Sequence, residues 1–235
     1  LSIQQSILPV QENINKHFDN FILYRPKDVV SGDYYWFSVS PTTKNSYFAA
    51  AIDCTGHGVP GAFMSMLTSR IITELINEKK ITNPKEILTN LDIQIRKSLK
   101  QDTSNNIDGL DICLCRIDKQ DEVKVTFCGS KLPFVYYSFK EKNIKKIKGS
   151  IKRIGGIVSL NNNLIFENKE IILYKNDVIL LQTDGYADQN NVNRKKFGIT
   201  KLLKLYKENA EKDMNVQKRI LEEKLDEWQE YTEQR

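Results

Sequence analysis

Residues 48–62 of the chain read FAAAIDCTGHGVPGA, and this stretch decides how the rest of the sequence is interpreted. An apolar run ends at Asp53, a glycine-rich turn follows, and Pro60 then opens an apolar pattern with helical spacing. Proline is favoured in the first turn of a helix, and glycine lets the backbone approach a neighbour closely. A carboxylate at the end of a buried strand, beside such a turn, suits a hard cation or a phosphate group.

Two further segments have the same layout, an apolar run followed by an aspartate next to glycine. Asp33 follows the run at residues 21–24, and Asp184 follows the run at residues 178–181. Divalent cations such as Mg²⁺ and Mn²⁺ prefer oxygen ligands, and several carboxylates must come together to bind them well. If the three strand ends converge, Asp33, Asp53 and Asp184 form a site for such cations. On spacing alone, the alternative that each aspartate stabilises only its own turn is equally open.

The composition is that of an ordinary globular domain with no charge bias toward nucleic acid. The chain has 235 residues, 40% of them hydrophobic, and a net charge of +5 from lysines spread along its length. Its four cysteines lack zinc-ligand spacing, which predicts buried, reduced thiols in a cytoplasmic protein. No apolar run is long enough to span a bilayer, so we expect no membrane contact by this domain. Because the net charge is modest and dispersed, we also expect no nucleic acid partner. Because the chain begins with Leu1 rather than Met, we expect it to be part of a longer protein.

The order of predicted elements favours an α+β fold in which amphipathic helices cover antiparallel sheets. The predicted strands cover residues 19–26, 34–39, 46–53, 110–117, 122–128, 133–138, 144–148, 170–174 and 177–183. Helical spacing predicts a helix over residues 60–79 with Phe63 on its apolar face, and another helix that starts at Asn83. Further helices are predicted over residues 197–208 and 214–232, and residues 1–10 read as the end of a helix stopped by Pro9.

Three stretches, taken in order, resemble the motifs of one protein family. They are residues 25–36 (RPKDVVSGDYYW), residues 53–62 (DCTGHGVPGA) and residues 183–185 (TDG), the last trailed by Phe197-Gly198. The chain is similar in these motifs to the metal-dependent protein serine/threonine phosphatases (PPM, protein phosphatase type 2C-like), in the bacterial stage II sporulation E-like branch. The resemblance covers about residues 18–235 and implies a sandwich of two antiparallel β-sheets flanked by helices. It also implies hydrolysis of phosphoserine or phosphothreonine by a water activated by two divalent cations, manganese or magnesium.

The resemblance assigns roles at the matching positions. Asp53 would bridge the two cations, and Cys54 would offer its backbone carbonyl to one of them. Asp33 would ligate one cation or orient its water shell, and Asp184 would bind the other cation, so these three aspartates are the implied catalytic residues. The family pattern also has an Asp-Asp pair on a final strand, and the sequence stops at Arg235 before it. We therefore expect this chain to lack its final acidic strand and one metal ligand, with impaired activity.

Four other residues near these motifs are candidates for roles in the site. Arg25 either binds the substrate phosphate with its planar guanidinium or forms a structural ion pair. His57 either donates a proton to the leaving oxygen or packs in the glycine loop. Asp108 and Asp111 resemble a motif of this branch that opens a core strand, and we interpret them as turn residues or as supports behind the metal ligands.

Together these features predict the catalytic output domain of a bacterial signalling phosphatase. By analogy with the branch, its substrate is a phosphoserine on a small regulatory protein, such as a STAS-like antagonist of an anti-sigma factor. Residues 1–17 would end a linker or signalling helix that joins residues 18–235 to an upstream sensor or coiled coil, and that sensor could anchor the parent protein in a membrane. A homodimer is among the oligomeric states that the sequence leaves open. The rival prediction is a catalytically silent module with the same fold that binds a phosphoprotein.

Overall fold

The computed structural model describes residues 3–156 and 166–230, and it contains two antiparallel sheets. The larger sheet is formed by β1 (Asp33–Val39), β2 (Ser46–Cys54), β3 (Gly109–Lys119), β4 (Val123–Ser130), β7 (Ile154–Gly155) and β8 (Lys169–Leu173). Its strand order is β1-β2-β3-β4-β8, with β7 paired to the start of β3. The smaller sheet, in the order β6-β5-β9, is formed by β5 (Phe134–Ser138), β6 (Asn143–Ile147) and β9 (Val178–Leu180). The predicted α+β class with two antiparallel sheets is confirmed.

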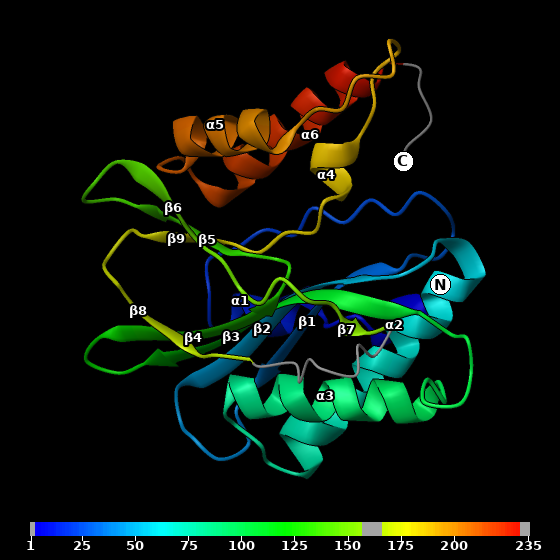
Figure 1. Ribbon diagram of the computed structural model, residues 1–235. Helices are drawn as coiled ribbons and strands as arrows, with labels where there is room; N and C mark the ends of the chain where they lie inside the picture. Colours follow the sequence, from blue (N-terminus) through cyan, green and yellow to red (C-terminus); the bar gives the residue numbers. More distant parts are fainter. Residues whose placement is uncertain (1–2, 157–165, 231–235) are drawn as a thin grey trace.

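Helices cover the outer faces of both sheets (Figure 1). The larger sheet is covered by α2 (Gly58–Thr73) and α3 (Pro84–Ser98). The smaller sheet is covered by α5 (Ile199–Asn209) and α6 (Met214–Gln229), which follow the short helix α4 (Gly185–Asp188). The flanking helices of the predicted sandwich are thus present. Across the described ranges, no helix combines the length and the apolar character that crossing a bilayer would need.

Local sequence signals account for the helices next to the larger sheet. The Asn83 side chain accepts a hydrogen bond from the Lys85 amide at 3.0 Å, and proline occupies the first turn of α3, as predicted. Helix α2 continues directly into a π-helical turn, η2 (Glu74–Glu78), so the predicted helix over residues 60–79 is one run. The prediction that Phe63 faces the core is wrong, because this side chain is 69% exposed and its neighbour Met64 is buried instead.

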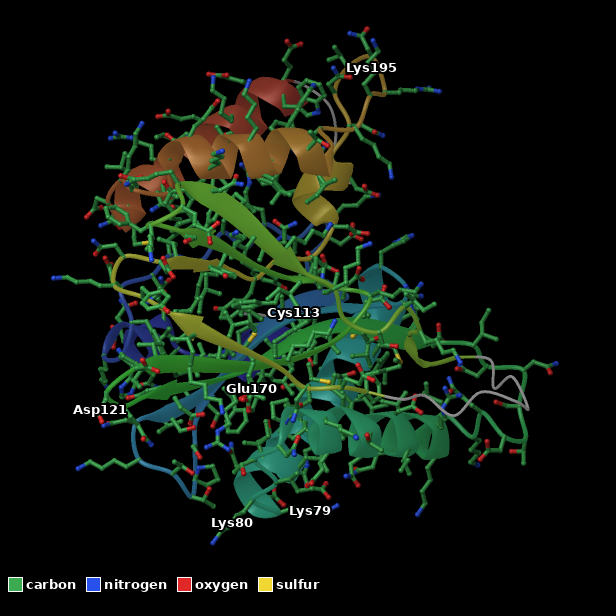
Figure 2. All side chains as sticks on the ribbon, turned by 60° about the vertical axis from the view of Figure 1, so that its left-hand side comes forward. Lys79, Lys80, Cys113, Asp121, Glu170 and Lys195 are labelled. Atoms are coloured by element: carbon green, nitrogen blue, oxygen red, sulfur yellow. The ribbon has the colours of Figure 1, made fainter. Side chains whose placement is uncertain are left out.

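Two apolar layers pack against the larger sheet, and a third apolar cluster lies around α4, α5 and α6. The first layer lies between the larger sheet and helices α2 and α3, and the second layer lies between the two sheets. Cys113 is fully buried and lies near the middle of the view in Figure 2, whereas Lys80, Asp121 and Lys195 lie at its edges. All four cysteines are buried and free, as the cysteine spacing predicted. The larger residues of the first layer include Phe48, Ile52, Ile72, Leu75, Ile87, Leu91 and Ile95, and those of the second include Cys115, Phe127, Phe134, Ile171 and Leu173.

Residues 19–26 were predicted as a strand, and this prediction is wrong. The segment has no β-ladder partner and is held by its side chains instead. Phe21 and Leu23 pack against the cluster around α4, α5 and α6, and the Tyr24 hydroxyl donates to the backbone carbonyl of Asp33 at 3.2 Å. Its apolar residues therefore serve packing between the layers rather than sheet pairing.

The N-terminal residues pack onto the domain. Residues Ile3–Ile7 form a 3₁₀-helix (η1) rather than the end of a longer helix, and α1 (Gln11–Asn15) follows it. The Gln4 side chain is buried, exchanges hydrogen bonds with the backbone of Ser31, and donates to Ser65 Oγ at 2.7 Å. The boundary proposed at residue 17 stays a prediction, and these contacts connect the segment before it to the loop that leads to Asp33.

Candidate functional site

Three aspartates stand side by side across the larger sheet. In the antiparallel register, Asp33 of β1 is paired with Asp53 of β2, and Asp53 is paired with Asp111 of β3. Residues directly opposite each other on neighbouring strands project to the same face, with Cβ atoms about 5 Å apart. Alternate residues of the same strands, such as Ala49 and Cys113, pack in the layer between the sheets. The three carboxylates therefore form one acid row that faces the smaller sheet.

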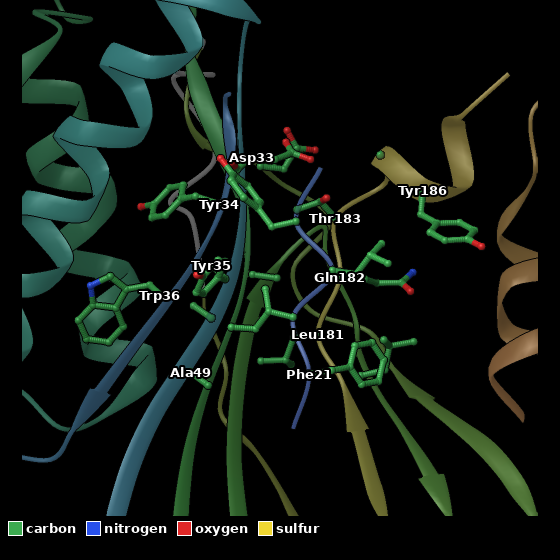
Figure 3. Close-up of a pocket in the computed structure, with 18 of the residues that line it drawn as sticks. Phe21, Asp33, Tyr34, Tyr35, Trp36, Ala49, Leu181, Gln182, Thr183 and Tyr186 are labelled. Atoms are coloured by element: carbon green, nitrogen blue, oxygen red, sulfur yellow. Dashed lines mark hydrogen bonds between the residues drawn. The ribbon is translucent and has the colours of Figure 1, made fainter. Parts of the chain in front are cut away.

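Asp184 reaches the acid row from the smaller sheet. It follows β9 by way of residues 181–183 and immediately precedes α4. A Cβ atom added to Gly185 would lie 3.5 Å from Asp33 Oδ2, so the two segments are in van der Waals reach of each other. Figure 3 shows Asp33 and Thr183 near each other at one end of the space between the sheets. Asp33, Asp53 and Asp184 all line a cavity of about 1050 Å³ between the two layers.

Glycines allow the loops around the acid row to touch. A Cβ atom on Gly32 would lie 2.7 Å from the Gly56 carbonyl oxygen, and one on Gly61 would lie 2.5 Å from that same oxygen. Such distances exclude any side chain, and Gly56 itself has a φ of +86°, which L-residues rarely adopt. The glycine-rich turn after Asp53 therefore packs directly on the loop before Asp33, and this contact fixes the separation of the two strand ends.

Burial and mutual repulsion raise the pKa values of the aspartates. Burial is the largest cause for Asp53, followed by the charges of Asp33, Asp184 and Asp111, and together they raise its pKa to about 8. Burial likewise raises the pKa of Asp33, with the charge of Asp184 adding to the effect. The pKa of Asp184 is raised by burial and by the neighbouring charge of Asp188. Arg153, the basic side chain that the described part of the chain places at the acid row, is paired with Asp111 and not with Asp33, Asp53 or Asp184.

The donor set suits divalent cations. Asp33, Asp53 and Asp184 offer carboxylate oxygens, and Cys54 ends β2 with its carbonyl against Gly32. Like charges held together disfavour ionisation, and a cation among them removes that repulsion. Within residues 3–156 and 166–230, no three His, Cys, Asp or Glu side chains are already arranged as a metal-binding group. These oxygens fit Mg²⁺ or Mn²⁺ by type, and their side chains would have to converge further to hold one.

Two predicted candidates lie at the rim of the site. The side chain of His57 is 87% exposed, with its Nδ1 atom 3.9 Å from Asp28 Oδ2, so the interpretation in which it packs in the glycine loop is wrong. Its role as a proton donor stays a prediction. Arg25 forms an ion pair of 2.6 Å with Asp226 of α6, which is the structural alternative given for it, and its binding of phosphate also stays a prediction.

Asp108 and Asp111 take different places. Both carboxylate oxygens of Asp108 accept hydrogen bonds, from Thr55 Oγ1 at 2.9 Å and from Asn106 Nδ2 at 2.8 Å, so Asp108 braces the turn that follows Asp53. Asp111 belongs to the acid row itself, where Arg153 binds it.

Sequence reasoning missed two charged residues that line the same cavity. Arg153 lies just before β7, a strand of two residues that was not predicted, and Asp188 closes α4. Glycine pairs often mark a close approach of two backbone segments, so Gly155-Gly156 is the signal that could have pointed to Arg153. Asp188 forms an ion pair of 2.5 Å with Lys196, eight positions later, and no local pattern indicates it.

Comparison with solved structures defines the class of protein. The SiaA-PP2C domain of Pseudomonas aeruginosa is 27% identical, with a TM-score of 0.85 over 99% of this chain and 89% of that one. The phosphatase domain of SpoIIE from Bacillus subtilis is 17% identical, with a TM-score of 0.52 over 88% and 82%. RsbX in complex with magnesium is 13% identical, with a TM-score of 0.57 over 91% and 87%. The fold is that of the PP2C-type phosphatases.

The family follows from the sequence. The family model for stage II sporulation protein E (SpoIIE) matches residues 43–234, which is well over half of the chain. The chain therefore belongs to the SpoIIE family of PP2C-like phosphatases, and the predicted family and enzyme class are confirmed. A comparison with curated proteins finds no match.

Proposed function

We propose that this phosphatase removes phosphate from serine or threonine residues of a protein and requires two divalent cations, manganese or magnesium. The observation that carries the proposal is that Asp33 and Asp53 of one sheet and Asp184 beside the other line the same cavity. When bound, such cations supply an activated water and positive charge for the phosphoryl oxygens. The chain supplies oxygen ligands, and the cost of keeping these carboxylates together favours cation binding.

Each residue of the site has a defined task in this proposal. Asp53 is paired with Asp33 in the register and lies within electrostatic reach of both Asp33 and Asp184, so it would be the carboxylate shared by the two cations. Asp33 and Asp184 would hold one cation each, and the carbonyl of Cys54 would add a ligand. His57 lies exposed just before α2 and would be the proton donor to the leaving oxygen.

The proposed substrate is a phosphoserine on a bacterial regulatory protein of the STAS-like type, and the domain would act as the output of a larger signalling protein. The contacts of Gln4 support the second part of this proposal. They connect the N-terminal segment, before residue 17, to Ser31, two positions before Asp33, and to Ser65 of α2. A displacement of the N-terminal segment would therefore be felt at the loop that carries a metal ligand.

A cation-dependence assay tests the proposed function. The protein should release phosphate from a phosphoserine peptide with Mn²⁺ or Mg²⁺, and release should stop in excess EDTA. The matched control is Asp121→Asn, an exposed aspartate in the turn between β3 and β4, which should leave turnover unchanged. Peptide binding without turnover under every cation condition would refute the proposal and favour the silent phosphoprotein-binding module.

A further inference from the structure

Arg153 is a charged residue at the acid row to which the proposed function gives no task. Its guanidinium binds Asp111 with two parallel hydrogen bonds, from Nε to Oδ1 at 2.8 Å and from Nη2 to Oδ2 at 3.0 Å. Such fork-to-fork pairs hold a guanidinium in a defined plane. The side chain of Asp111 is 10% exposed, whereas that of Arg153 is 35% exposed. One end of Arg153 is thus fixed by a buried carboxylate while part of it faces the cavity.

The backbone on both sides of Arg153 is held in place. Strand β7 pairs with the start of β3, so that Gly155 lies opposite Gly109. A Cβ atom on Gly109 would lie 3.1 Å from Cδ of Arg153, so the absence of that atom lets the arginine stem cross the strand. Helix α3 binds the other side, because Asp92 Oδ1 accepts from the Gly155 amide at 2.7 Å. The position of the guanidinium is therefore set by the fold.

A helix residue strengthens this attachment. Arg96 Nη1 donates to the carbonyl of Gly156 at 2.8 Å, and its Nε donates to Asp92 Oδ2 at the same distance. The pair Asp92 and Arg96 is largely buried, with side chains 12% and 18% exposed. These hydrogen bonds hold a strand of only two residues, so the segment that carries Arg153 has a defined position.

The guanidinium keeps hydrogen-bonding capacity toward the cavity. Nε and Nη2 are used by Asp111, and Nη1 donates to no other described residue. The charges of Asp53 and Asp184 raise the pKa of Arg153 after the larger effect of its hydrogen bond to Asp111, which places the guanidinium within electrostatic reach of both aspartates. Arg25, the arginine that the sequence suggested for phosphate binding, forms an ion pair with Asp226 of α6.

We propose that Arg153 binds the phosphoryl group of the substrate, with Asp111 as the residue that positions it. A guanidinium presents several N–H donors in a plane and matches phosphate oxygens better than an ammonium group does. Cations held by Asp33, Asp53 and Asp184 would attract the phosphoryl group to the same cavity that Arg153 lines. The inference rests on the proposed phosphatase reaction, because it assigns a substrate-binding group to that site.

Binding of inorganic phosphate tests the inference separately from turnover. The full natural chain, loaded with Mn²⁺, is titrated with inorganic phosphate by calorimetry, and Mn²⁺ affinity is measured alone in a second titration. Arg153→Ala should weaken phosphate binding about 10- to 100-fold, the loss typical of a charge-assisted hydrogen bond, with Mn²⁺ affinity changed less than about twofold. Arg153→Lys should fall between this variant and the parent. Lys152→Ala is the matched control and should bind as the parent does, because Lys152 makes its hydrogen bonds through its backbone.

Three outcomes would overturn the inference. They are an unchanged phosphate affinity in folded Arg153→Ala, an Mn²⁺ affinity that falls as much as the phosphate affinity, and a Mn²⁺-loaded parent that binds no phosphate. If Arg153→Ala fails to fold, Arg153→Lys decides, because it keeps the charge and loses the planar fork; phosphate binding as tight as in the parent would then refute the proposal. A parent that binds phosphate but hydrolyses no phosphopeptide would refute the proposed function. The phosphate titrations would still decide whether Arg153 binds the phosphate group.

Discussion

Replacing Asp53 by asparagine should make the metal-free protein more stable above neutral pH. The folded protein raises the pKa of Asp53 from 3.8 to about 8 through burial and the charges of Asp33, Asp184 and Asp111. A raised carboxyl pKa means that the folded state holds the proton more tightly than the unfolded state does. The associated stability is fully present below about pH 4 and is lost progressively as the pH rises to about 8. Asparagine carries no charge at any of these pH values.

The size of the effect follows from the pKa shift. At pH 7, about three pKa units of the shift lie below the working pH, which at about 1.4 kcal/mol per unit gives a ceiling of about 4 kcal/mol. The buried amide also loses hydration, so we expect about half of this, about 2 kcal/mol. For a chain of this size, 2 kcal/mol corresponds to a rise of about 4–8 °C in Tm. The asparagine amide can also donate a hydrogen bond to Asp33, which an ionised Asp53 cannot do.

Thermal unfolding followed by circular dichroism measures this effect in EDTA at pH 5 and pH 8. The parent should lose stability between the two pH values, and Asp53→Asn should lose clearly less. Asp121→Asn, which removes an exposed carboxylate beyond the opposite end of β3 from Asp111, should follow the parent at both pH values. Asp53→Asn melting below the parent at pH 8 in EDTA would refute the reasoning, since it would mean that the charge of Asp53 stabilises the empty site.

Three further predictions concern the same site. With saturating Mn²⁺, Asp53→Asn should lower phosphopeptide turnover by orders of magnitude. Asp108→Asn should lower turnover much less, because Asp108 binds Thr55 rather than a cation. Comparable losses of turnover in the two folded variants would contradict the assigned roles. Gly61→Ala should destabilise the fold by about 2 kcal/mol or more and impair turnover, because its Cβ atom would lie 2.5 Å from the Gly56 carbonyl oxygen; denaturant unfolding with parental stability would exclude this contact. Burial and neighbouring charges raise the pKa values of Asp33, Asp53 and Asp184, so Mn²⁺ must displace protons from them at low pH. Mn²⁺ affinity measured by calorimetry should therefore be at least tenfold weaker at pH 5 than at pH 8. Equal affinities at the two pH values would show that these carboxylates are not ligands.

The sequence predicted correctly those elements that depend only on residues close together in the chain. The Asn83 cap, the alternating strand at residues 34–39 and the glycine turn after Asp53 each depend on neighbouring residues, and the structure shows each in place. The strand predicted at residues 19–26 failed because an apolar run does not reveal whether it will find a ladder partner. Phe63 was assigned to the wrong side of α2 because apolar spacing alone did not fix which side of the helix meets the sheet.

The site was predictable in part for the same reason. Asp33, Asp53 and Asp184 were found from their shared position after an apolar run, next to glycine. Arg153 was not, because its partner Asp111 lies 42 positions earlier and meets it only through the pairing of β7 with β3. Contacts of this kind depend on topology, which single-sequence patterns do not encode.

The acid row also has a consequence for how the sheet assembles. Successive side chains of a strand point to opposite faces, so a slip of one residue between β1, β2 and β3 would turn a carboxylate from the cavity toward the layer packed by α2 and α3. That layer is apolar, with Phe48, Ile52 and Leu114 fully buried in it. A charge placed there without a partner would cost several kcal/mol. The residues proposed to bind cations in the finished protein would thus also penalise misregistered sheets during folding, before any cation or substrate is bound.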